Sequence, residues 1–244
     1  MTTKNKMFDT SPRLYARVAG LLYLIIIIAG FSSEFFFRRK IIIPGDAITT
    51  ATNIIASPGL WRIGVTLDFL CVICAIIMAM IYFVLLNPVH KNLNILAAFF
   101  RLVSIVLQAV ASLYLITALF PLDQSAYLNA FTPAQLYAIT TLAIKSHGYG
   151  YGISLLFLGC CFTIHGYLIF KSGFLPEVLG ILIQVAGLGY MINGFALILA
   201  PALTKWTFPI IILPVLVGET SLSLWLLVKG VDVNKWITKA NKNF

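Results

Sequence analysis

Long apolar runs separated by short polar loops dominate the sequence. A helix needs about 20 apolar residues to cross the hydrocarbon core of a bilayer. Six runs meet that length, and they predict transmembrane helices at residues 18–37, 61–86, 93–120, 149–170, 179–203 and 206–228. The predicted fold is all-α: a polytopic membrane helical bundle with six transmembrane helices, forming one integral membrane domain over residues 1–244.

The segment between the first two runs, residues 41–60, is too short and too polar to span a bilayer. Pro44-Gly45 predicts a turn, and Asp46 can cap a helix whose apolar face carries Ile48, Ala51, Ile54 and Ile55. This spacing predicts a short helix lying in the membrane interface. An ordered loop packed over the bundle fits the same residues equally well.

Composition supports a membrane protein. Of the residues, 60% are hydrophobic and 10% are charged, and the mean hydropathy is +0.97, far from values typical of soluble domains. The net charge of +9 lies mostly in tails and loops, which indicates contact with anionic lipid and no nucleic-acid partner. Expected partners are membrane lipid and a small-molecule or ion substrate. We expect no cofactor or metal, and the sequence leaves the oligomeric state open.

The distribution of Lys and Arg predicts the orientation. Six spans place both tails on one side of the membrane. That side carries ten basic residues: Lys4, Lys6, Arg13, Arg17, Lys91, Lys171, Lys229, Lys235, Lys239 and Lys242. The other side carries five: Arg38, Arg39, Lys40, Arg62 and Lys205. The bias predicts both termini in the cytoplasm, although the triplet Arg38 to Lys40 opposes it.

Glu219 is the acidic residue to which we give most weight, because it lies near the middle of the last predicted span. Ten helical residues rise roughly 15 Å, so its short side chain cannot reach water at either surface. A carboxylate at that depth must be protonated, paired or hydrated by a cavity. Pro209, Pro214 and Gly218 precede it, and prolines in a helix free backbone carbonyls and favour a kink.

The third run carries a polar stripe that should face other helices. Arg101, Ser104, Gln108 and Ser112 recur at steps of three and four, which places them on one helical face. Gln108 lies at the depth of Glu219, and we expect these two residues or Arg101 and Glu219 to meet. Snorkelling of Arg101 to the nearer surface is the alternative.

A second set of polar residues lies closer to the opposite surface. Its members are Glu34, Asp68, Lys145, His147, Tyr190 and Asn193. They would line an outward-opening polar pocket if their helices bring them together. Contact of each residue with headgroups and water is an equally good interpretation.

Several short motifs, spread almost from end to end, resemble one family. They are PRLYARVAG at 12–20, PGDA at 44–47 with TNI at 52–54, YFVLLNPV at 82–89, FRL at 100–102, GYL at 166–168 with SGFLP at 172–176, and GE at 218–219 with LWLL at 224–227. The family is a group of small bacterial integral membrane proteins classed as a domain of unknown function. One departure lies around Gly159-Cys160-Cys161, where the family more often has a glycine-histidine pair.

The resemblance implies a multi-pass protein of a bacterial cytoplasmic membrane, and it supplies no activity. The leading hypothesis is small-solute or ion transport coupled to protonation of Glu219, with Gln108 and Arg101 in the same site. The alternatives are an intramembrane enzyme that acts on lipid through Asp68 and His147, with or without a metal, and a non-catalytic accessory protein.

Overall fold

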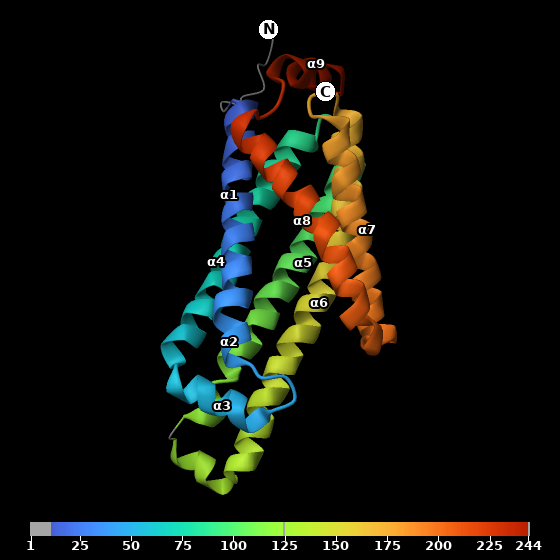
Figure 1. The fold of residues 1–244 in the computed structure, drawn as a ribbon. Helices are drawn as coiled ribbons and strands as arrows, with labels where there is room; N and C mark the ends of the chain where they lie inside the picture. Colours follow the sequence, from blue (N-terminus) through green and yellow to red (C-terminus); the bar gives the residue numbers. More distant parts are fainter. Residues whose placement is uncertain (1–10, 124, 244) are drawn as a thin grey trace.

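The computed structural model describes residues 11–123 and 125–243, and every regular element in them is helical. Lys4 and Lys6, which contributed to the predicted charge bias, lie outside this part of the chain. Six helices are long and apolar enough to span a membrane, as predicted. They are α1 (Pro12–Ser32, continued by η2, Ser33–Arg38, and α2, Arg39–Ile41), α4 (Pro58–Leu86), α5 (Lys91–Thr117), α6 (Pro133–Ser172), α7 (Glu177–Leu199) and α8 (Thr204–Val228) (Figure 1).

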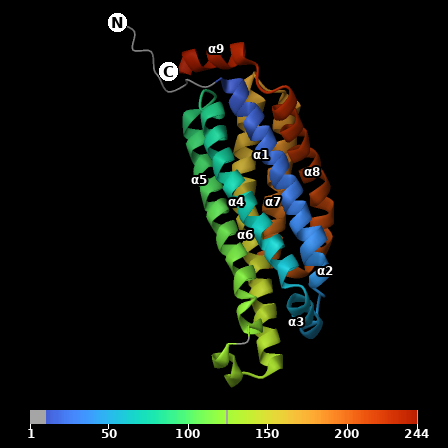
Figure 2. The same ribbon diagram turned by 90° about the vertical axis from the view of Figure 1, so that its left-hand side faces the viewer.

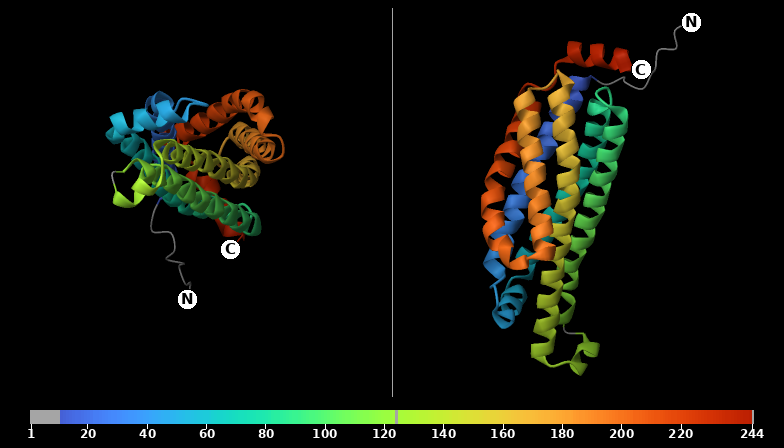
Figure 3. Two further views of the ribbon diagram at one scale, coloured as in Figure 1. Left: turned by 90° about the horizontal axis from the view of Figure 1, so that it is seen from below. Right: turned by 90° about the vertical axis from the view of Figure 1, so that its right-hand side faces the viewer.

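The six spans form a closed ring. Each packs against its neighbours in sequence, in the order α1, α4, α5, α6, α7, α8, and α8 closes the ring by packing against α1. In Figure 1, α8 runs obliquely between α1 and α7, and Figure 3 views the bundle along its axis and from the α7 side. A closed ring directs one face of every span toward a common interior.

The polar and apolar residues are arranged for a lipid environment. Large apolar side chains cover the outside; examples are Ile73, Phe99 and Val106, each more than half exposed. Buried positions include many polar side chains, among them Ser33, Asp68, Ser104, His147 and His165. Polar side chains in a span are expected to face other helices, and here they do.

The fourth span is longer than its apolar stretch predicts. The apolar part was expected at residues 149–170, and Thr132-Pro133 was expected to start a helical segment that leads into it; α6 does begin at Pro133, after a capping box formed by Thr132 and Gln135. A capped first turn with proline at its start stabilises the helix before the apolar residues begin. α5 and α6 consequently extend beyond the other spans (Figure 2). The fifth span ends at Leu199, earlier than the expected residue 203.

The predicted interfacial helix is present as α3 (Ala47–Ala56), which lies at the end of the bundle opposite the described C-terminal helix (Figure 1). Ala51 and Ile54 are buried, but Ile48 and Ile55 are exposed by 64% and 52%. The apolar face is therefore divided between the bundle and the surroundings. Asp46 caps the helix as expected: its side chain accepts the Thr49 N–H at 2.9 Å.

Acidification is expected to weaken the start of α3. Hydrogen bonds from the Thr49 hydroxyl and N–H hold the pKa of Asp46 below its usual value. The cap is therefore intact above the unfolded pKa of about 3.9, and its contribution is lost as pH falls through the lower folded value. Hydrogen–deuterium exchange of Thr49, corrected for intrinsic rates, should show this loss of protection. Asp46→Ala should remove the pH dependence, and an unchanged dependence in that variant would contradict the assignment.

A helix that was not predicted, α9 (Val233–Asn243), lies across the end of the bundle where the first span begins (Figure 2). Trp236 anchors it: the side chain is 4% exposed, and its Nε1 donates to the Leu85 carbonyl at 2.9 Å. Lys235, Lys239 and Lys242 of the expected tail therefore belong to an ordered amphipathic helix, as found at membrane surfaces.

Candidate functional site

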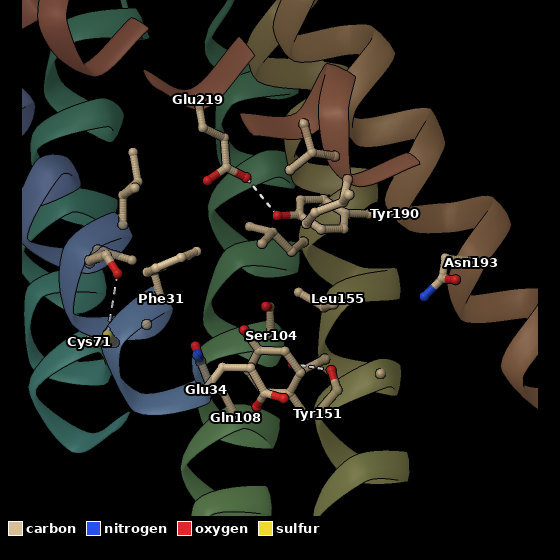
Figure 4. A pocket seen from close by; sticks show the side chains of 18 of the residues that line it. Phe31, Glu34, Cys71, Ser104, Gln108, Tyr151, Leu155, Tyr190, Asn193 and Glu219 are labelled. Atoms are coloured by element: carbon tan, nitrogen blue, oxygen red, sulfur yellow. Dashed lines mark hydrogen bonds between the residues drawn. The ribbon is translucent and has the colours of Figure 1, made fainter. Parts of the chain in front are cut away.

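A cavity of about 970 Å³ occupies the interior of the helical ring. All six spans contribute to its wall, which is mostly apolar. Pockets that bind small molecules in proteins typically measure about 300–1,000 Å³. Figure 4 shows part of the lining, with Glu219 and Tyr190 toward one end and Glu34 and Gln108 toward the other.

Glu219 faces this cavity from α8. Its Oε1 accepts a hydrogen bond from the Tyr190 hydroxyl of α7 at 2.7 Å (Figure 4). Tyr23 of α1 also lies beside the carboxyl group, although its buried hydroxyl has no hydrogen-bond partner among the described residues. The prediction that Glu219 points into the bundle is thus confirmed, and its hydrogen-bond donor comes from a neighbouring helix.

One polar residue from each span gathers around this end of the cavity. We call this set the Glu219 cluster: Tyr23 (α1), Tyr82 (α4), Arg101 (α5), His165 (α6), Tyr190 (α7) and Glu219 (α8), all of which line the cavity. Arg101 interacts electrostatically with the other members. The ring therefore brings together residues that are far apart in sequence.

The expected contacts of Glu219 with Arg101 or Gln108 are not formed. All three residues line the cavity, but the described part of the chain contains no hydrogen bond or ion pair between Glu219 and either of them. The reason is the order of the ring, in which α8 contacts α7 and α1 while α5 lies across the cavity. A glutamate side chain reaches a neighbouring helix more readily than the opposite one.

A second group, the Asp68 cluster, lies at the α3 end of the cavity and consists of Ser33, Glu34, Arg38 and Asp68. Arg38 donates from Nη1 to an Asp68 carboxylate oxygen and to Ser33 Oγ at 2.8 Å. It also donates from Nε to Glu34 at 2.9 Å. These contacts satisfy the arginine and hold Asp68 in an ion pair, so Asp68 is not a free base.

The local backbone explains how Arg38 enters the bundle. Residues five apart in an α-helix point about 140° away from each other. η2 is a π-helical segment, whose wider turn brings Ser33 and Arg38 onto one side. The sequence analysis counted Arg38 only in the charge balance of one membrane side and did not predict its contacts with Ser33 and Asp68 inside the bundle.

The remaining expected residues have different surroundings. His147 is buried within α6, and its Nδ1 lies 3.0 Å from the Ala111 carbonyl oxygen. Asn193 lines the cavity, and its Oδ1 accepts from the Thr207 hydroxyl at 3.1 Å. Lys145 does not join either cluster: it is exposed and lies outside the cavity lining, because its position on the long α6 faces outward.

Comparison with known proteins decides the family. The model of the family described as Domain of unknown function (DUF4386) matches residues 18–230. The chain belongs to this family. An uncharacterized protein of Archaeoglobus fulgidus is 31% identical over 176 residues, which cover 70% of this chain and 85% of the relative. No solved structure matches the chain.

In this DUF4386 protein, the sequence interpretation missed Arg38, Tyr23, Tyr82 and His165 as site residues. Tyrosines within spans are common enough that each alone carries little information. The useful signal would have been one hydroxyl or imidazole on each of several spans at a depth similar to that of Glu219. No three His, Cys, Asp or Glu side chains of the described residues lie close enough to hold a metal ion.

Proposed function

We propose that this protein binds a small solute in its interior cavity and carries it across the membrane together with a proton bound by Glu219. The cavity, with the Glu219 carboxyl on its wall, is the observation that carries this proposal. Carboxylates inside membrane bundles are common in proton relays of transporters. Glu219 has a tyrosine donor and no paired cation among the described residues, so its proton can exchange without breaking an ion pair.

The two clusters have different roles in this proposal. The Asp68 cluster is a closed set of ion pairs and hydrogen bonds, suited to holding α1 and α4 together at one end of the cavity. The Glu219 cluster contains the groups that are not mutually satisfied. Solute and proton would therefore meet at the Glu219 cluster, and Glu219 would be the proton-binding residue.

Proton-linked uptake into liposomes tests the proposal. The purified protein is reconstituted with the pH dye pyranine inside, and small anions, cations and zwitterions are added in turn to the outside. We expect at least one solute to change the luminal pH faster than in protein-free liposomes. Glu219→Gln should abolish this acceleration, because the amide cannot bind the proton.

Glu177→Gln is the matched control, because it makes the same chemical change at an exposed residue at the start of α7. This control variant should leave the proton-linked flux unchanged. Equal proton-linked flux in wild type and Glu219→Gln would overturn the proposal. Absence of flux with every solute, combined with loss of stability in Glu219→Gln, would favour the accessory-protein alternative.

We further propose that the protein lies in a bacterial cytoplasmic membrane with both termini in the cytoplasm. The α9 end of the bundle carries eight described basic residues: Arg13, Arg17, Lys91, Lys171, Lys229, Lys235, Lys239 and Lys242. At the other end, Arg38 is held within the Asp68 cluster, which reduces the opposing charge and supports the positive-inside assignment. A green fluorescent protein fused after Phe244 should fluoresce; an active alkaline phosphatase fusion there would contradict this orientation.

A further inference from the structure

We propose that the part of the cavity around Arg101 binds the anionic head group of an amphipathic molecule, a carboxylate or phosphate monoester attached to a hydrocarbon chain. This inference deepens the proposed function by naming the class of solute. Binding at equilibrium does not require transport, so the two proposals can fail separately.

Arg101 is the first observation. It lines the cavity, and in the described part of the chain it makes no hydrogen bond and no ion pair. Arg38, by contrast, is satisfied by Glu34, Ser33 and Asp68. A guanidinium removed from bulk water is costly without a counter-charge. Its planar set of donors matches the oxygens of a carboxylate or phosphate.

The buried hydroxyl of Tyr82, whose side chain interacts electrostatically with Arg101, is the second observation. Tyr82 is only 7% exposed, it lines the cavity, and its hydroxyl has no hydrogen-bond partner among the described residues. The Tyr82 ring stacks on His165 with centroids 5.2 Å apart, which holds it near Arg101. Buried hydroxyls are normally hydrogen-bonded, and an anion at Arg101 would supply the missing acceptor.

The apolar part of the cavity wall indicates the chemistry of the ligand beyond its anionic head group. Between the polar groups the cavity is lined by side chains such as Met78, Leu158, Phe162 and Val215. A hydrophilic anion would leave this surface unused, whereas a hydrocarbon chain would cover it and add hydrophobic free energy. The combination of one cation with a long apolar wall therefore fits an amphipathic anion better than an inorganic one.

Glu219 couples binding of the anion at Arg101 to binding of a proton. An ionised carboxylate repels an anion bound at Arg101 across the same cavity, and a protonated one does not. Anion binding and protonation of Glu219 therefore favour each other. The titratable and charged groups that interact electrostatically with Glu219 from the surrounding helices are Tyr23 (α1), Tyr82 (α4), Arg101 (α5), Tyr151 (α6) and Tyr190 (α7).

Binding of dodecyl phosphate to the full-length protein in a non-ionic detergent tests the inference. Titration calorimetry and the rise in melting temperature should both report binding. Dodecyltrimethylammonium, which has the same chain and the opposite charge, should bind at least about tenfold more weakly, and so should inorganic phosphate, which lacks the chain. Dioleoyl phosphatidate distinguishes a membrane lipid from a free single-chain amphiphile: binding of either supports the site, and the tighter of the two identifies the source.

Variants locate the site. Arg101→Gln should weaken dodecyl phosphate binding roughly tenfold to a hundredfold, and Tyr82→Phe about threefold to tenfold. Arg62→Gln is the matched control, because it removes the same charge from an exposed position outside the cavity lining and should leave binding unchanged. If Arg101→Gln does not fold, Arg101→Lys and Tyr82→Phe carry the test, with the lysine variant retaining preference for the anion.

Equal binding of the anionic and cationic amphiphiles by wild type would overturn the inference whatever the variants do. Equal weakening by Arg101→Gln and Arg62→Gln would also overturn it. Tight, Arg101-dependent binding without proton-linked flux would support this site and count against transport. Proton-linked flux of other solutes, with no binding of dodecyl phosphate, would support transport and overturn the anion site.

Discussion

Replacing Arg38 by Met is expected to lower the free energy of unfolding by about 3–5 kcal/mol, the usual cost of removing one partner from a buried ion pair. The Asp68 side chain is 9% exposed, and Arg38 is its cationic partner. Methionine keeps much of the side-chain volume but leaves the carboxylate with the Ser33 hydroxyl at 2.9 Å as its remaining donor. Reversible unfolding in mixed detergent micelles measures the difference.

Arg39→Met is the control on the adjacent residue. Arg39 is 57% exposed, its Nε lies 3.8 Å from Glu34, and its guanidinium lies 4.1 Å from the centroid of the Phe35 ring, so its loss should lower stability by about 1 kcal/mol or less. The double variant Arg38→Met/Asp68→Asn should recover much of the stability, because no unpaired charge remains. Equal losses for Arg38→Met and Arg39→Met would show that Arg38 is not a structural ion-pair partner.

The spans could be predicted because lipid imposes a simple requirement on length and polarity. A spanning helix must be long and apolar, and polar side chains within it must face inward. These two rules gave the six helices and the inward orientation of Glu219. They also gave the stripe on α5, where Arg101, Ser104 and Gln108 line the cavity as expected.

The partners of these residues could not be predicted, because contacts depend on the order of the helices around the ring. Depth placed Gln108 level with Glu219 and placed Tyr190 in the outer group. In the structure Tyr190 donates to Glu219 because α7 and α8 are adjacent, whereas α5 lies across the cavity. Depth along the membrane is one coordinate, and the angular position of each helix is the other.

Local departures from a regular helix account for other errors. The π-helical turn at Ser33–Arg38 redirects Arg38 into the bundle. No single residue in the sequence of this segment predicts a π-helical turn. α9 was missed for a different reason. It has only 11 residues, three of which are lysines, so a search for spanning helices passes over it even though Trp236 fixes it to the Leu85 carbonyl.

Gly166→Ala is expected to lower the free energy of unfolding by about 1–3 kcal/mol, the range for overpacking a tight contact. A Cβ at Gly166 would lie 2.6 Å from the Gly180 carbonyl oxygen, and one at Gly180 would lie 2.6 Å from the Gly166 carbonyl oxygen. Gly159 and Gly187 form a second reciprocal pair along the same two helices. Because the obstacles at both pairs include backbone atoms, α6 and α7 must separate to admit even one methyl group.

Gly148→Ala supplies the same substitution in the same helix without the contact, since a Cβ there meets nothing within 4 Å. Alanine favours a helix over glycine by about 1 kcal/mol, so this variant should be neutral or more stable, opposite in sign to Gly166→Ala. Because α6 and α7 carry His165 and Tyr190 into the Glu219 cluster, their separation should also weaken dodecyl phosphate binding. Equal stability of the two variants would show that close approach of α6 and α7 does not hold this side of the cavity together.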